Sequence, residues 1–140
     1  EHAHQLDYAA AKHPGITWLI DHMMYPEPNM GPGWDVYKPV LELAKHDNVM
    51  MKISDIHNRS EGEFPFTDMH DVIKMAFEAF GVERCLWGTG YPGYHRVENG
   101  WLSLEDELKL VCEGFDWLTA DEIAKYLGDN AMGVWNWDNE

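Results

Sequence analysis

The sequence has few cysteines and no long apolar run, and both absences narrow the class of protein. No apolar segment approaches the roughly 20 residues that a membrane-spanning helix needs, so we expect no membrane insertion. The first residues, EHAHQLDY, lack the basic and apolar segments of a secretory signal peptide. The two cysteines, Cys85 and Cys112, lack the CxxC spacing of a metal site. We therefore expect them to be small core residues in the reducing environment of the cytoplasm.

Basic residues are scarce as well. Ten Lys and Arg residues stand against 25 Asp and Glu, which gives a formal net charge of −15. A surface of this sign repels phosphate groups, so the counter-ion release that drives nucleic-acid binding would be lost. An anionic membrane surface is equally unfavourable. We predict no nucleic-acid partner and no membrane partner, and we interpret the acidic residues as a solubilising surface.

Three common motifs of enzymes are also missing. The sequence contains no P-loop, no G-x-G-x-x-G and no G-x-S-x-G. These absences disfavour P-loop nucleotide hydrolases, dinucleotide-binding enzymes and serine hydrolases of the α/β-hydrolase type.

What the sequence does contain is an alternation of helical and strand-like segments. At 140 residues and 45% hydrophobic content, the chain is long enough for a single domain over 1–140 with a real core. Helices are predicted over 4–13, 35–46, 67–80 and 103–117. A last helix is predicted to begin at a capping box of Thr119 and Glu122 and to end at Gly128. Strands are predicted over 16–22, 48–56 and 84–89. Strands that alternate with helices predict an α/β fold with right-handed crossovers and a parallel sheet.

The segments that follow the strands are long, whereas those that follow the helices are short. The long ones begin at His22, at Asp55 and at Gly90, just before Tyr91. In parallel α/β sheets the loops at the carboxyl ends of the strands carry the chemistry. The asymmetry therefore predicts one functional face.

Three candidate residues for catalysis follow the first two strands. His22 ends a strand, where an imidazole can act as a metal ligand or general base; the alternative is a histidine bonded to a loop carbonyl. Asp55 and His57 are two residues apart, so their side chains point the same way if the strand continues. The carboxylate could then orient a neutral imidazole. The alternative is a turn aspartate next to a surface histidine.

Two of the three arginines lie on the same face. Arg59 and Arg96 follow strand ends, where a bidentate contact with a substrate carboxylate is natural, although an ordinary loop ion pair fits equally well. Arg84 precedes its strand and is interpreted as structural. Tyr91 lies in the loop that also contains Arg96, and we include it among the substrate-binding candidates.

Four segments together carry a family resemblance. They are HPGITWLIDHM, NVMMKISDI, AFGVERCLWGTGYPGY and the tail TADEIAKYLGDNAMGVW. In this order and spacing the chain resembles the amidohydrolase-related family, the lactonase, decarboxylase and hydratase branch of the amidohydrolase superfamily. The resemblance implies that the chain is the C-terminal part of a TIM (β/α)8 barrel, namely its last three strands with their helices.

The resemblance also implies a chemistry, which is hydrolysis of a lactone or a related reaction on a small, usually carboxylated substrate. Some relatives use one divalent metal, zinc or manganese, and others use none. His22 matches the strand-end histidine of the family, a metal or substrate ligand. The catalytic aspartate of the family maps onto Gly90, which has no side chain for this role. Asp55, His57 and His95 are the candidates to replace it; otherwise the protein is a non-catalytic homologue that binds a ligand or a partner subunit.

A complete barrel takes about 250 residues, and three parallel strands leave two open edges. We therefore expect an N-terminal barrel portion, a partner chain or self-association to complete the sheet. A complete, small flavodoxin-like domain also fits the alternation of strands and helices, but it lacks a phosphate-binding loop.

Overall fold

Three short strands form one parallel sheet. The structure, a computed structural model, describes residues 2–91, 100 and 102–135. The strands are β1 (Trp18–Ile20), β2 (Val49–Ser54) and β3 (Cys85–Gly88), and they lie in the order β1-β2-β3. Both pairings are parallel, with Ile20 opposite Met51 and Met51 opposite Cys85. The predicted parallel sheet is confirmed, and β1 and β3 are its edges among the described residues.

Seven α-helices accompany the sheet in the described residues. They are α1 (Ala3–Lys12), α2 (Lys38–Leu41), α3 (Ile56–Arg59), α4 (His70–Phe80), α5 (Leu104–Gly114), α6 (Ala120–Ala124) and α7 (Asn130–Trp135). The turn α3 forms where the sequence predicted a loop. None of the described helices is long and apolar enough to cross a membrane.

The last helical segment begins as predicted but does not end as predicted. Thr119 and Glu122 form the expected capping box. Gly128, however, lies inside a π-helical turn over Lys125–Asp129 that joins α6 to α7. Side chains on both sides of Gly128 form hydrogen bonds to β2, to β3 and to the segment before β3. The Tyr126 hydroxyl donates to the carbonyl of Ile53, and the Asn130 amide donates to the carbonyls of Val82 and Cys85.

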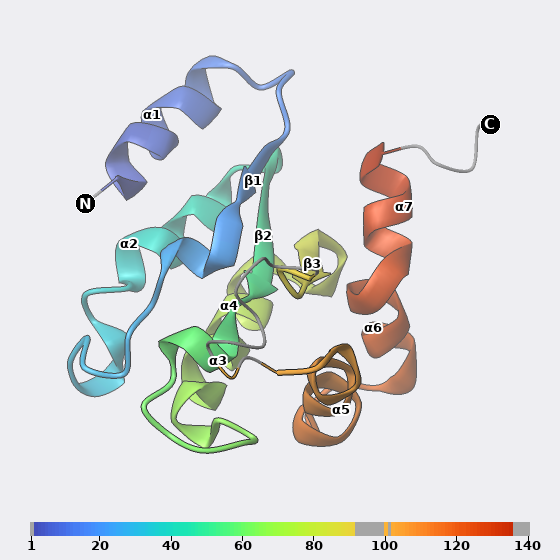
Figure 1. The fold of residues 1–140 in the computed structure, drawn as a ribbon. Coiled ribbons are helices and arrows are strands. Elements are labelled where there is room, and N and C mark those ends of the chain that lie inside the picture. Colours follow the sequence, from blue (N-terminus) through green and yellow to red (C-terminus); the bar gives the residue numbers. More distant parts are fainter. Residues whose placement is uncertain (1, 92–99, 101, 136–140) are drawn as a thin grey trace.

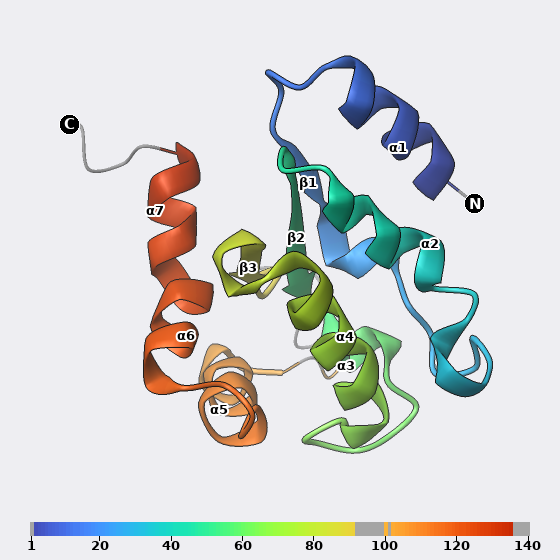
Figure 2. The same ribbon diagram turned by 180° about the vertical axis from the view of Figure 1, so that it is seen from behind.

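The two faces of the sheet differ in their surroundings. In β2, Val49, Met51 and Ile53 are fully buried, whereas Met50 and Lys52 on the other face are half-buried. Side chains alternate across a strand, so the first set faces the helical layer. Helices α2 and α4 lie on the side of the sheet that faces the viewer in Figure 2, and none of the described helices lies in front of the sheet in Figure 1. The open face corresponds to the interior expected for a barrel.

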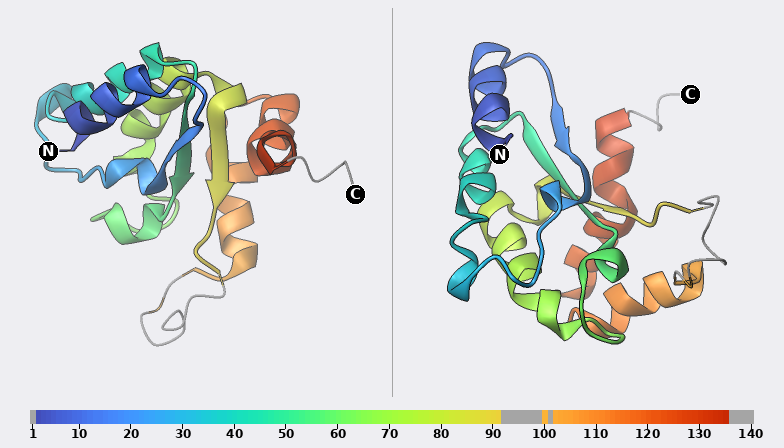
Figure 3. Two further views of the ribbon diagram at one scale, coloured as in Figure 1. Left: turned by 90° about the horizontal axis from the view of Figure 1, so that it is seen from above. Right: turned by 60° about the vertical axis from the view of Figure 1, so that its left-hand side comes forward.

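Helix α5 buries only part of the apolar stripe predicted for it. That stripe comprises Leu104, Leu108, Val111, Cys112 and Phe115; Val111 and Phe115 are buried, whereas the other three are exposed. Leu110 and the charged Glu107, which lie outside the stripe, are buried as well. The prediction that both cysteines are core residues is therefore confirmed for Cys85 and wrong for Cys112. Helices α3 and α5 lie together beyond the carboxyl ends of the strands in two views (Figures 1 and 3).

Candidate functional site

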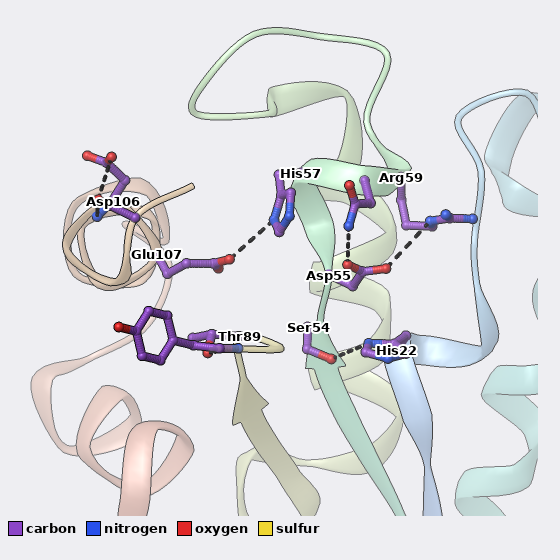
Figure 4. Close-up of polar contacts among 11 residues, drawn as sticks. His22, Ser54, Asp55, His57, Arg59, Thr89, Asp106 and Glu107 are labelled. Atoms are coloured by element: carbon purple, nitrogen blue, oxygen red, sulfur yellow. Dashed lines mark hydrogen bonds and ion pairs between the residues drawn. The ribbon is translucent and has the colours of Figure 1, made fainter. Parts of the chain in front are cut away.

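His22 lies at the carboxyl end of the sheet and contacts two polar side chains. Its Nδ1 is 2.9 Å from the hydroxyl oxygen of Ser54, which ends β2. Its Nε2 is 3.3 Å from a carboxylate oxygen of Asp21, and Asp21 also pairs with Lys52. Figure 4 shows the imidazole directed at Ser54 across the ends of β1 and β2. The structure therefore places the predicted histidine among a hydroxyl, a carboxylate and an ammonium group.

A serine, a histidine and an aspartate in contact invite comparison with a nucleophilic triad. Ser54, however, is only 3% exposed, whereas the His22 side chain is 20% exposed. A buried hydroxyl is poorly placed to reach a substrate carbonyl. Ser54 is therefore better suited to orienting the imidazole, as a second group does for many catalytic or metal-binding histidines.

β1 ends at Ile20, so His22 lies in the turn that follows the strand, not at the end of the strand where it was predicted. This turn has an unusual backbone. Four consecutive residues without glycine adopt the left-handed region, with φ of 47° at His22, 52° at Met23, 57° at Met24 and 58° at Tyr25. Each such residue costs about 1–2 kcal/mol because its Cβ approaches the following carbonyl. Backbone of this kind persists only where the surroundings hold it, and it clusters at functional sites.

Asp55 and His57 do not share a direction. β2 ends at Ser54, and Asp55 adopts a left-handed conformation with φ of 63° before α3 begins. The prediction that the strand continues is therefore wrong, because α3 starts within one residue of the strand end. The carboxylate of Asp55 instead accepts a hydrogen bond from Asn58 and lies 4.0 Å from the Nε of Arg59.

Arg59 is brought to the His22 turn by a stacking contact. Its guanidinium carbon lies 5.1 Å from the centroid of the Tyr25 ring, and that ring lies 5.3 Å from the imidazole of His22. A partly desolvated cation over an aromatic face is a favourable arrangement. Two of the predicted site residues, His22 and Arg59, are thus joined through Tyr25, a residue that the sequence did not single out.

His57 faces helix α5 rather than His22. Its Nδ1 is 3.2 Å from a carboxylate oxygen of Glu107, and the two side chains are 6% and 4% exposed. Figure 4 shows Glu107 reaching from α5 towards His57. The sequence analysis missed Glu107. The sequence offers one indication of its role: Glu107 lies about one helical turn before Leu110 and Val111, and all three are buried.

The end of β3 is open. Gly90 is exposed with φ of +67°, and a Cβ added there would meet no atom within 4 Å. Tyr91 is 59% exposed, and its backbone N–H donates to the Thr89 hydroxyl at 3.0 Å. The candidates His95 and Arg96 lie outside the described residues.

The described residues do not by themselves fit a complete metal centre. They contain no group of three His, Cys, Asp or Glu side chains that could hold an ion. His22 could supply one imidazole once its contact with Asp21 is exchanged, but zinc in proteins takes three or four such ligands.

A family model and a curated protein match most of this chain. The family model described as Amidohydrolase matches residues 2–137. The chain belongs to the amidohydrolase family. A curated relative, L-fucono-1,5-lactonase of Burkholderia ambifaria, is 25% identical over 134 residues, which are 92% of this chain and 44% of the lactonase.

Solved structures confirm the fold of this amidohydrolase chain. An amidohydrolase from Burkholderia multivorans with bound HEPES superposes with a TM-score of 0.75 and 20% identity over 96% of this chain and 50% of its own. The same Burkholderia enzyme with bound zinc gives 0.74, again with 20% identity, over 96% of this chain and 49% of its own. A 2-pyrone-4,6-dicarboxylic acid hydrolase-like protein from Pseudomonas putida gives 0.69 and 23% identity over 87% and 44% of the two chains. These neighbours are TIM barrels, so the predicted class of parallel βα units from such a barrel is confirmed. The chain spans about half the length of the relatives that it matches.

Proposed function

We propose that this chain forms one side of the active site of a hydrolase that opens a lactone or a related C–O bond in a small, carboxylated substrate. The contact of His22 with Ser54 at the carboxyl end of the sheet carries the proposal. The family membership and the name of the curated lactonase support it.

The residues of this chain divide the work as follows. The imidazole of His22, held by Ser54, is available to bind the lactone carbonyl or accept a proton from the attacking water. Water adds to the carbonyl carbon, the ring C–O bond breaks, and the proton taken from water returns to the departing alkoxide. The guanidinium of Arg59, stacked on Tyr25, is placed to bind a substrate carboxylate. A divalent metal, where present, would polarise the carbonyl, and its remaining ligands would come from outside the described residues.

Completion of the barrel is part of the proposal. Both β1 and β3 have an unpaired edge among the described residues, and the open face of the sheet carries Lys52 and Leu19. Unpaired parallel edges favour association. We infer that an N-terminal barrel portion, a partner chain or a second copy covers this face and supplies the rest of the site.

The test is hydrolysis of L-fucono-1,5-lactone and of 2-pyrone-4,6-dicarboxylate by the full-length protein, followed by proton release. His22→Asn should lower kcat/KM by about 100-fold or more, in line with the loss of an acid–base or ligand group. His13→Asn, at an exposed position beyond α1, is the matched control and should leave the rate unchanged. Equal rates in wild type and His22→Asn would overturn the assignment.

Arg59→Gln separates binding from chemistry. It should raise KM for the dicarboxylate by about tenfold, which corresponds to the loss of one charge-assisted contact, and leave KM for the uncharged lactone unchanged. Equal effects on both substrates would contradict a role in carboxylate binding.

One observation favours a second candidate, a non-catalytic homologue that binds a ligand or partner. The resemblance maps the catalytic aspartate of the family onto Gly90, and the space around Gly90 is open. Aspartate is among the few residues that tolerate a left-handed backbone. Gly90→Asp should therefore fold normally. A wild type without hydrolytic activity that gains activity or zinc binding through Gly90→Asp would establish this candidate, and an active wild type would exclude it.

A further inference from the structure

The left-handed turn over residues 22–25 is contacted by the buried side chain of Tyr37. Tyr37 immediately precedes α2 and is 1% exposed. Its hydroxyl donates a hydrogen bond of 2.7 Å to the backbone carbonyl of Met23, in the middle of the turn. Burial raises the pKa of this hydroxyl, so it stays protonated and remains a donor.

Other contacts hold the two ends of the turn. The Met23 side chain is fully buried, and the N–H of Tyr25 donates to the carbonyl of His22 at 2.9 Å. The Tyr25 ring is covered by Arg59. The hydrogen bond from the Tyr37 side chain, by contrast, is made to the backbone in the middle of the turn.

We propose that Tyr37 is a positioning residue for His22. By fixing the Met23 carbonyl, its hydroxyl keeps the backbone of His22 in the left-handed region and so directs the imidazole at Ser54. Loss of the hydroxyl lets the turn relax towards ordinary backbone angles, because the remaining contacts hold the ends of the turn and no longer its centre. The consequence for hydrolysis rests on the proposed function, whereas the effect on the orientation of His22 does not.

The chain contains a matched control for the loss of a buried tyrosine hydroxyl. Tyr126 is also 1% exposed, and its hydroxyl donates to a backbone carbonyl, that of Ile53, at 2.6 Å. Ile53, however, lies within the regular strand β2, where the ladder with β3 holds the backbone independently. Tyr126→Phe therefore removes the same kind of bond without releasing a strained turn.

The test compares Tyr37→Phe with Tyr126→Phe in the full-length protein by long-range 1H–15N NMR of the histidine rings, at about pH 8, where an ordinary imidazole is neutral. His22→Gln assigns the signal. Tyr37→Phe should shift the ring nitrogens of His22 and speed hydrogen exchange at the Tyr25 amide by about tenfold relative to Tyr126→Phe. Equal shifts and equal exchange in the two variants would overturn the proposal.

Hydrolysis of the lactone supplies an independent measurement. Tyr37→Phe should lower kcat by about tenfold with little change in KM, and Tyr126→Phe should change neither. If the wild-type protein does not hydrolyse the lactone but the His22 signal still responds to Tyr37→Phe, the proposed function is refuted and the positioning role of Tyr37 is supported. Should Tyr37→Phe fail to fold, the same comparison is made in a Met24→Gly background, where glycine accepts the left-handed backbone at low cost. An unchanged His22 signal there would overturn the inference.

Discussion

Lys52 lies across Gly88 on the open face of the sheet. A Cβ added at Gly88 would come within 3.1 Å of the Cδ of Lys52, closer than side chains normally approach. The glycine at the end of β3 thus gives the lysine room to reach Asp21, beside His22. Gly88 therefore has a packing role next to the candidate site.

The first prediction follows from this contact. Gly88→Ala should destabilise the wild-type protein by about 0.5–1 kcal/mol, because Lys52, held by Asp21, has to give way. In a Lys52→Ala background the same change should stabilise by a similar amount, since alanine costs less conformational entropy than glycine. Chemical denaturation of the four proteins measures this coupling. An equal effect of Gly88→Ala in both backgrounds would refute the contact.

The buried pair of His57 and Glu107 gives the second prediction. Glu107→Ala should lower the free energy of unfolding by about 3 kcal/mol, because it removes the carboxylate partner of a buried imidazole. Glu105 lies on the same helix with its side chain 78% exposed and paired with Lys109. Glu105→Ala should cost less than about 1 kcal/mol, as exposed pairs do. Similar losses in the two variants, measured by denaturant titration, would contradict the importance of the buried pair.

Hydrophobic periodicity predicted most of the fold. The apolar run of β2 and the amphipathic pattern of α4 are local signals, and both elements form within the ranges predicted for them, 48–56 and 67–80. The shape of the turn at His22 could not be predicted, because left-handed backbone without glycine is stabilised by contacts from outside the turn. The bond from Tyr37 is such a contact.

The candidate site was predicted in part for a similar reason. His22 could be found because strand ends in parallel sheets carry chemistry. Glu107 could not, because its burial depends on His57, a distant residue that packs against α5 only in the folded chain. The exposed Leu104 and Leu108 add an apolar pattern to the helix that does not match its buried residues.

Arg84 supplies a third prediction, at the amino end of β3. Its Nε donates to the carbonyl of Phe80 and its Nη1 to that of His46, both at 2.9 Å. This geometry agrees with the structural interpretation from the sequence. Arg84→Lys should cost about 2 kcal/mol, because one ammonium group cannot reproduce two divergent charged hydrogen bonds. A loss below about 0.5 kcal/mol in thermal unfolding would contradict it.

The two cysteines should differ in reactivity. Burial raises the pKa of the Cys85 thiol from 9.0 to about 12, and Cys85 is fully buried. Cys112 is exposed. A disulfide reagent such as DTNB should therefore modify one thiol in the native protein and two after denaturation, since the thiolate is the reactive form. Rapid reaction of two thiols in the native state would contradict the buried position.

The raised pKa of Cys85 also predicts a loss of stability in alkali. Below pH 9.0 the thiol is protonated in both the folded and the unfolded chain, so its contribution is constant. Between pH 9.0 and about 12 the unfolded chain releases this proton and the folded chain retains it, so the unfolded state binds fewer protons and stability falls as pH rises. The slope approaches about 1.4 kcal/mol per pH unit for one proton.

Denaturation of wild type and Cys85→Ala across this pH range measures the slope. Cys85→Ala should remove the part of the slope that begins near pH 9.0, while the buried Tyr37 and Tyr126, whose pKa values burial raises above 10.0, sustain the part at higher pH. Parallel curves for the two proteins would show that the thiol does not carry the effect.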